Sequence, residues 1–272
     1  MDDLQTLLES AKQTAREAGS LVRSHLRTHH EVERKSRFDF VTEVDRLSEE
    51  FIRSSLSRKY PDHLFFGEEE ISSRKEAEDS IIATLPPDKC IWVVDPVDGT
   101  TNFIRGIPQF GISIALVKGG EVLVGAVYDV SLDELYSAKK GGGAFLNDSP
   151  IHVSSTNDVL DFIISTSFPA ANLVFRHKVL EKLEKHGDEI TSLRIWNCAS
   201  LAVVAVACGR TDAHIEPGIH LWDFSAGKLI VEEAGGMFTD LVGKPFSLYE
   251  KHVLASNGKC HDKLLQILQA KE

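Results

Sequence analysis

Residues 90–150 restrict the fold most, because short apolar runs follow one another there at the spacing of antiparallel strands. CIWVVD at 90–95 has the composition of a short buried strand. GISIALV and EVLVGAVYDV flank KGG, which is typical of a hairpin turn. DELYSA then leads into the turn-rich segment GGGAFLND. We therefore expect this part of the chain to form much of an antiparallel sheet.

Helical patterns precede and follow this β-rich part. Residues 3–27 repeat apolar side chains at i, i+3 and i+4, and a second helix is expected over 43–59 with Thr42 as its N-cap. After residue 150, strand-like segments alternate with helices expected at 173–186, 199–208, 223–236 and 260–270. The alternation predicts an α/β fold in which helices pack in layers against sheets. We expect a single domain over 1–272, with an N-terminal lobe at 1–150 and a C-terminal lobe at 151–272.

Composition and charge exclude several kinds of protein. The chain has 272 residues and a formal net charge of -11, and affinity for nucleic-acid phosphates depends mainly on Lys and Arg. The first residues, MDDLQTLLES, lack the basic and apolar regions of a signal peptide, and no apolar run reaches the roughly 20 residues of a membrane span. The four cysteines lack CxxC spacing and indicate free thiols in a reducing compartment. We therefore expect a soluble cytoplasmic protein with no nucleic-acid or membrane partner.

Asp95 and Asp98 end an apolar strand and stand just before Gly99. Carboxylates at the end of a buried strand are costly unless a positive group lies there. One explanation is that both acids cap the following helix by accepting backbone N–H bonds. The other is that they bind a cation. These residues alone leave both explanations open.

Two further acids share this placement at the boundary of a regular element, Glu68 in GEEE and Asp223 in HLWDFSAG. Glu68 has an ordinary alternative as a solvated side chain, and Asp223 as an N-cap. If these two converge with Asp95 and Asp98, each like-charge pair ~4 Å apart costs about 4 kcal/mol near a protein surface. Bound cations would offset that repulsion, and ligands that are all oxygen indicate Mg²⁺, Mn²⁺ or Ca²⁺.

Four motifs resemble those of the inositol monophosphatase family, a group of Mg²⁺-dependent, lithium-sensitive phosphatases. WVVDPVDGTTNF is similar to the family's D-P-[IVL]-D-G-[ST]-x-N-F, and WDFSAG to its W-D-x-[SA]-A-G. GEE at 67–69 and KSRFDFVTEVD at 35–45 are similar to two further family elements. All occur in the family's order across nearly the whole chain. The resemblance implies one catalytic domain with the family's layered αβαβα sandwich.

The resemblance also implies a metal-ligand set. Glu68, Asp95 and the backbone carbonyl of Val97 would bind one ion. Asp95, Asp98 and Asp223 would bind a second. Glu68 would share a third through water, giving roughly two or three Mg²⁺ ions per site.

The catalytic roles follow from the same motifs. Asp45 and Thr100 would orient and deprotonate the attacking water, with Glu68 as a further catalytic residue. The backbone N–H groups of Gly99 and Thr100 would bind the phosphate, because the first N–H groups of a helix are unpaired and point toward an anion. The implied reaction is hydrolysis of a small phosphate monoester by metal-activated water, without a covalent enzyme intermediate.

The residues before Asp223 bear on the substrate. Glu216 lies seven positions earlier in EPGIHLWD, where family members that act on inositol monophosphates use a Glu to bind ring hydroxyls. Its alternative is a solvated acid at a strand end. The resemblance implies a substrate site made of Asp98, Ala199, Glu216 and Asp223. We read His220 as a packing or orienting residue.

Two segments depart from the family pattern. RIWNCAS places Trp196 and Asn197 where the family has a run of small residues, and STSFP has Ser167 for glycine. Inositol monophosphate is the favoured substrate. The alternatives are fructose 1,6-bisphosphate, a 3'-phosphoadenosine phosphate, histidinol phosphate, or a catalytically silent regulator. Family members are commonly homodimers, so we expect a homodimer.

Overall fold

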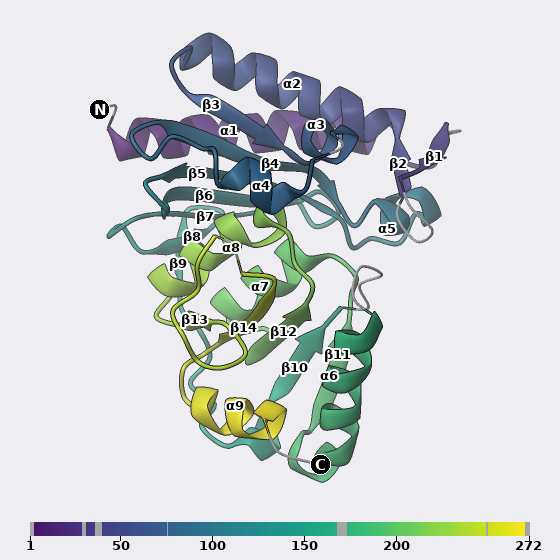
Figure 1. Ribbon diagram of the computed structural model, residues 1–272, viewed down its shortest axis with the longest axis vertical. Helices are drawn as coiled ribbons and strands as arrows, with labels where there is room; N and C mark the ends of the chain where they lie inside the picture. Colours follow the sequence, from purple (N-terminus) through teal and green to yellow (C-terminus); the bar gives the residue numbers. More distant parts are fainter. Residues whose placement is uncertain are drawn as a thin grey trace.

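Helices and sheets alternate through the molecule in the order α, β, α, β, α (Figure 1). The computed structural model describes residues 3–28, 31–35, 40–74, 76–167, 173–248 and 250–269. The layered αβαβα fold expected from the sequence is confirmed. Residues 36–39 of the KSRFDFVTEVD motif, and Phe168 and Pro169 of STSFP, lie outside the described residues.

The larger sheet has seven strands in the order β3-β4-β5-β6-β7-β8-β9. Their bounds are β3 (Leu64–Gly67), β4 (Cys90–Asp98), β5 (Gly111–Lys118), β6 (Glu121–Asp129), β7 (Glu134–Lys139), β8 (Ala144–Leu146) and β9 (Ser149–Ile151). β3 pairs in parallel with β4, and every later neighbour is antiparallel. The antiparallel sheet predicted over 90–150 is therefore confirmed. Gly119 and Gly120 close the β5–β6 hairpin with positive φ, as a tight turn requires.

Two helices cover each face of this sheet. Helices α1 (Leu4–Ser24) and α2 (Glu43–Lys59) pack on the outer face, and α7 (Ala199–Ala207) and α8 (Leu221–Glu233) pack on the inner face (Figure 1). The last two lie between the sheets, which explains why they are apolar nearly all round. Thr42 caps α2 as predicted, with its side chain accepting from the Val44 N–H.

The smaller sheet contains strands that the sequence pattern did not reveal. Its order is β11-β10-β12-β14-β13, with bounds β10 (Ile163–Thr166), β11 (Ser192–Ile195), β12 (Ala213–Pro217), β13 (Met237–Thr239) and β14 (His252–Ser256). β10 runs parallel to β11 and β12, and β14 runs antiparallel to β12 and β13. Helices α6 (Leu173–Lys185) and α9 (His261–Gln269) cover its outer face (Figure 1). We did not predict β11, which is mostly exposed, or β14, whose burial comes from strands distant in the chain.

Short elements complete the described chain. They are β1 (Val32–Arg34), β2 (Phe40–Thr42), α3 (Glu68–Ser73), α4 (Glu78–Ile82), α5 (Thr100–Arg105) and the 3-10 helices η1 (Val159–Asp161) and η2 (Gly187–Glu189). All four cysteines are free thiols. Among the described residues, no helix combines the length and apolar character needed to cross a membrane.

The contact between β6 and α8 depends on a missing side chain. A Cβ on Gly125 would lie 2.6 Å from the Ala226 carbonyl oxygen. We expect Gly125→Ala to lower the free energy of unfolding by about 1–3 kcal/mol, because backbone on both sides must move. Gly187→Ala is the control, since no atom lies within 4 Å of its added Cβ. Equal urea midpoints for the two variants would show that α8 does not depend on this close approach.

Candidate active site

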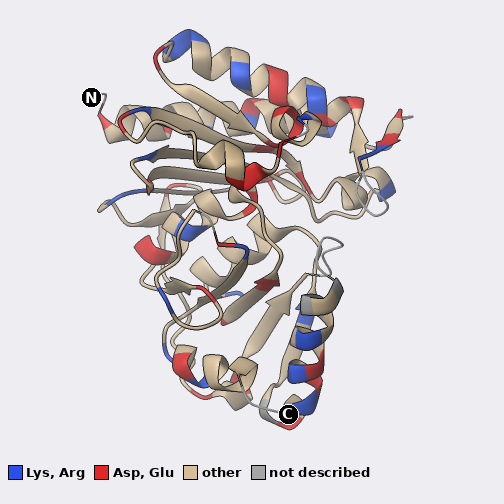
Figure 2. Cartoon of the chain, in the orientation of Figure 1, with Lys and Arg blue, Asp and Glu red and all other residues tan. Residues whose placement is uncertain are grey.

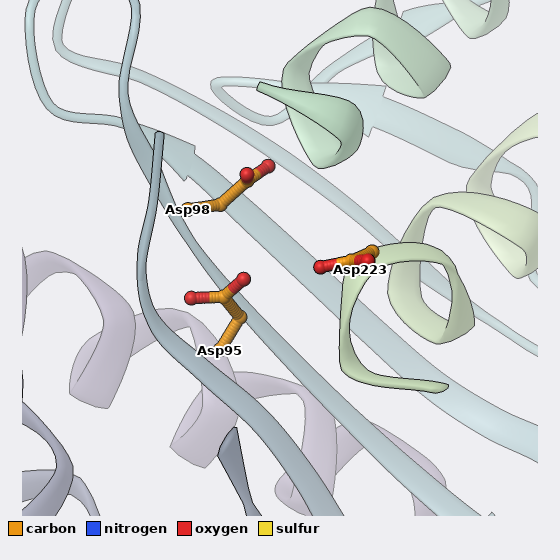
Figure 3. Close-up of side chains that lie close together, drawn as sticks. All are labelled: Asp95, Asp98 and Asp223. Atoms are coloured by element: carbon orange, nitrogen blue, oxygen red, sulfur yellow. The ribbon is translucent and has the colours of Figure 1, made fainter. Parts of the chain in front are cut away.

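Three carboxylates meet where β4 leaves the larger sheet. The pairing of β4 with β5 shifts register between Asp95 and Asp98, at Pro96, which has no N–H for the ladder. Asp223 comes from the first turn of α8. One oxygen of each acid lies within 4.8 Å of the others, so Asp95, Asp98 and Asp223 form one cluster (Figure 3).

Hydrogen bonds fix each of these acids in the cluster. Asp98 Oδ2 accepts from the Ser200 N–H at 2.7 Å and from the Ser200 hydroxyl at 2.6 Å, at the start of α7. Asp223 Oδ2 accepts from the His220 N–H at 2.8 Å. Asp95 Oδ1 accepts from the Val97 N–H at 3.0 Å. The explanation that Asp95 and Asp98 cap the following helix is therefore wrong, since the N-cap of α5 is Gly99 and no side chain caps that helix.

The cluster is strongly disfavoured in its fully charged form. Burial, followed by the charges of Glu68, Asp98 and Asp223, raises the pKa of Asp95 well above its usual range. Burial and the charges of Asp98 and Glu68 likewise raise the pKa of Asp223, although the charge of His220 opposes this. Burial also raises the pKa of Asp98 against the lowering effect of its Ser200 bonds. A cation in the cluster would remove this penalty.

Glu68 lies at the edge of the cluster. Its Oε1 accepts from Lys35 Nζ at 2.9 Å, and Lys35 also reaches Glu69 at 2.6 Å. Glu68 is outside the group of three, yet its charge is the second largest cause of the raised pKa of Asp95. Further acidic residues occupy the first turns of α3 and α4 (red in Figure 2). Lys35 is a counter-charge beside Glu68 that sequence reasoning did not identify.

Asp45 and Thr100 form a hydrogen-bonded pair beside the cluster. The Thr100 hydroxyl lies 3.0 Å from Asp45 Oδ1 and 3.0 Å from the Val97 carbonyl oxygen. Asp45 Oδ2 accepts from the Thr42 N–H at 2.9 Å, which is the other half of the α2 capping box. Burial raises the pKa of Asp45 to about 6, although its bonds to Thr42 lower it. The carboxylate is thus fixed in place and titrates near neutrality.

Gly99 joins β4 to α5 in a conformation that only glycine adopts easily. Its φ is 85°, and an added Cβ would lie 2.8 Å from the Gln109 carbonyl oxygen. The structure therefore places a side-chain-free backbone at the N-terminus of α5, next to Asp98 and Thr100.

The residues expected at the sugar end come from the smaller sheet and α7. Glu216 lies on β12 and is 2% exposed, while Ala199 is the first residue of α7. Asn197 has φ 51°, in the left-handed region that Asn tolerates better than most residues, which explains how it stands where the family has glycine. Ser167 is 7% exposed, and its hydroxyl has no hydrogen-bond partner among the described residues.

Sequence reasoning also missed a contact between Glu78 and His220, the residue whose N–H binds Asp223. Glu78 Oε2 lies 2.7 Å from His220 Nδ1, and Glu78 Oε1 accepts from the Leu221 N–H at 2.9 Å. Burial raises the pKa of Glu78, but its bonds to His220 and Lys251 prevail and lower it to about 2. His220, whose pKa is raised to about 9, stacks on Trp222 with ring centroids 4.8 Å apart. Residue type alone gives no signal for this pair, which is 142 positions apart.

Comparison with known proteins identifies the class. Residues 3–272 match the model of the inositol monophosphatase family. The chain is 35% identical over 266 residues to inositol monophosphatase 1 of Sus scrofa, covering 95% of this chain and 92% of that protein. It is 35% identical over 254 residues to a fructose-1,6-bisphosphatase/inositol-1-monophosphatase of Thermotoga maritima, covering 93% and 92%.

A solved structure has a similar fold over nearly the whole chain. The extragenic suppressor protein suhB from Bartonella henselae matches with a TM-score of 0.88 at 33% identity, covering 98% of this chain and 100% of that chain. Fold, acidic site and relatives together define a metal-dependent phosphatase of small phosphate monoesters. The chain belongs to the inositol monophosphatase family, and the resemblance found in the sequence is confirmed.

The raised pKa values predict how stability depends on pH without metal. A carboxyl group whose pKa is higher in the folded than in the unfolded chain binds its proton more tightly when folded, so stability falls as pH rises. In EDTA, we expect Asp95→Asn to be more stable than wild type by about 2 kcal/mol near pH 8, with the gain shrinking toward pH 5.

Urea unfolding at several pH values measures this difference, and the histidines that also titrate there are common to both proteins. Added Mg²⁺ should stabilise wild type and have little effect on Asp95→Asn. If Asp95→Asn is less stable than wild type at every pH in EDTA, the claim that clustered negative charges destabilise the metal-free protein is wrong.

Proposed function

We propose that this protein hydrolyses inositol monophosphate to inositol and phosphate with Mg²⁺. The observation that carries the proposal is the cluster of Asp95, Asp98 and Asp223 beside the Asp45–Thr100 pair. The family supports hydrolysis of a small phosphate monoester, and several relatives are named for inositol phosphates.

The donor set fits Mg²⁺. All three clustered ligands are carboxylates, which hard divalent cations prefer. Burial and neighbouring negative charges raise their pKa values, and a bound cation would offset both effects. Glu68, Asp95 and the Val97 carbonyl would hold one ion, and Asp95, Asp98 and Asp223 another. Bound Mg²⁺ supplies a water of lowered pKa and stabilises the leaving oxygen. We assign a third, weaker ion to Glu68, and expect Li⁺ to inhibit.

Asp45 and Thr100 handle the proton of the attacking water. Thr100 donates to Asp45 Oδ1, so its oxygen is oriented to accept a proton from a water on its free side. Asp45 has a pKa raised to about 6, which suits a base that takes that proton near neutral pH. The Val97 carbonyl oxygen, also 3.0 Å from the Thr100 oxygen, is the alternative acceptor for the same proton.

The backbone at Gly99 and Thr100 is suited to the phosphate. Gly99 has no side chain to exclude the ester, and the N–H groups at the start of α5 are available to an anion. Glu68 completes the catalytic residues as a neighbour of Asp95.

Glu216 and Ala199 define the inositol end of the proposed site, beside Asp98 and Asp223. An ionised carboxylate accepts hydrogen bonds from neighbouring hydroxyls and therefore selects polyol leaving groups. The Thermotoga maritima relative is named for fructose 1,6-bisphosphate as well as inositol 1-phosphate, and that ester is the second candidate. We also propose a homodimer, because family members are commonly homodimers, and a cytoplasmic location, because the four cysteines are free thiols.

The Thr100 hydroxyl gives a sharp test of the proton step. We expect Thr100→Ala to lower kcat by about 10²-fold or more, because the oriented oxygen is lost. Thr100→Ser keeps that oxygen and should stay within about tenfold of wild type. Steady-state phosphate release at saturating Mg²⁺ measures both. If kcat falls by a similar factor in both variants, the Thr100 side chain contributes through packing and not through its hydroxyl.

The substrate is tested by phosphate release from inositol 1-phosphate, fructose 1,6-bisphosphate, 3'-phosphoadenosine 5'-phosphate and histidinol phosphate. Each is measured with Mg²⁺, without it, and with added Li⁺. We expect kcat/KM to favour inositol 1-phosphate at least about tenfold, or about 1.4 kcal/mol. Preference for another ester would overturn the substrate, and no Mg²⁺-dependent release from any of them would overturn the proposed function.

A further inference from the structure

A chain of buried polar residues lies behind Glu216 on the smaller sheet. His214 and Ser165 are both 0% exposed and stand opposite each other where β10 pairs with β12. Side chains alternate along β12, so His214 and Glu216 share one face, while Ala213 and Ile215 join the core on the other. An imidazole is thus enclosed in the sheet two residues from the proposed sugar-reading carboxylate.

The side chains of Ser165, His214 and Glu216 form a chain of contacts, with His214 in the middle. Ser165 Oγ lies 3.0 Å from His214 Nδ1, and His214 Nε2 lies 3.2 Å from Glu216 Oε2. Neither Nε2 nor Oε2 has a well-aligned hydrogen bond in the described chain, although both atoms are enclosed. A buried carboxylate without a hydrogen-bond partner is costly, and the His214 imidazole is the group that lies beside Glu216 to offset that cost.

The serine decides what the imidazole presents to Glu216. Ser165 Oγ also lies 3.3 Å from the Ala213 carbonyl oxygen. If its hydroxyl donates there, Ser165 accepts from Nδ1–H, and a neutral ring turns a bare Nε2 toward the carboxylate. If it donates to Nδ1, Nε2 carries a proton and is the donor nearest to Oε2 in this group. The second arrangement is favoured, because two acceptors at 3.2 Å repel.

We propose that His214, oriented by Ser165, is a positioning residue that holds Glu216 Oε2 and leaves Oε1 to accept from substrate hydroxyls. The inference rests on the proposed function, in which Glu216 reads a polyol leaving group. It adds a specificity-determining pair outside the motif residues. In this arrangement His214 contacts neither the phosphate nor the metal. A change at His214 should therefore alter binding of the hydroxylated leaving group only.

The test compares inositol 1-phosphate with p-nitrophenyl phosphate, which has no hydroxyls for Glu216 to bind. In His214→Phe, we expect kcat/KM for inositol 1-phosphate to fall about tenfold further than for the aryl ester, chiefly through KM. His214→Gln keeps a donor near the Nε2 position and should recover most of that selectivity. Ser165→Ala should lose part of it, because the tautomer is no longer set.

A double-mutant cycle separates positioning from packing. In Glu216→Gln, adding His214→Phe should cost no further selectivity, since the group that it positions is gone. The matched control is His261→Gln, another buried histidine, which is held by Thr239 and Ser256. Ser256 is at the other end of β14 from Val253, the pairing partner of Glu216, so this variant should not change the ratio of the two esters.

The outcomes are distinct. Equal losses on both esters in His214→Phe, or additive losses with Glu216→Gln, would overturn the positioning role while wild type stayed selective. If His214→Phe does not fold, wild-type selectivity in Ser165→Ala overturns it as well. Wild type without preference for inositol 1-phosphate over the aryl ester would overturn the proposed substrate and this inference together.

Discussion

Mutual repulsion among Asp95, Asp98 and Asp223 is the interaction on which the rest of the site depends. The three carboxylates have oxygens within 4.8 Å of one another, and burial followed by neighbouring negative charges raises their pKa values. The charged cluster therefore destabilises the folded chain unless a cation binds. The family's chemistry uses that unfavourable arrangement, because a site that repels itself has a strong preference for a divalent ion. Stability is given up locally and restored on binding.

The fold holds these charges in place from three directions. Strand β4 carries Asp95 and Asp98 at its C-terminal end, where its pairing with β5 becomes irregular between the two acids. Helix α8 brings Asp223, and Ser200 at the start of α7 binds Asp98. Both helices are packed between two sheets, so the acids cannot separate without disturbing the largest core cluster. The layered architecture therefore keeps the three acids together against their repulsion, whereas a flexible loop would let them move apart.

The sequence predicted the elements that have long or regular apolar patterns, together with the acids at their ends. It found β4 and α8 because extended apolar runs precede or follow a carboxylate. It missed β14, whose five residues sit centrally in the smaller sheet, since their burial comes from neighbours distant in the chain. The same holds for the Glu78–His220 pair and for His214, whose importance lies in a contact with Glu216 rather than in its residue type. Partners across the fold are tertiary information that local periodicity does not carry.

Anomalous diffraction from crystals grown with Mn²⁺ tests the central claim most directly, because Mn²⁺ takes the same oxygen ligands as Mg²⁺ and scatters anomalously. The account predicts an anomalous peak within bonding distance of Asp95, Asp98 and Asp223, and no such peak in Asp95→Asn crystals grown alike. Wild-type crystals with the three carboxylates converged but no peak between them would contradict it, and would leave the acidic cluster without its cation.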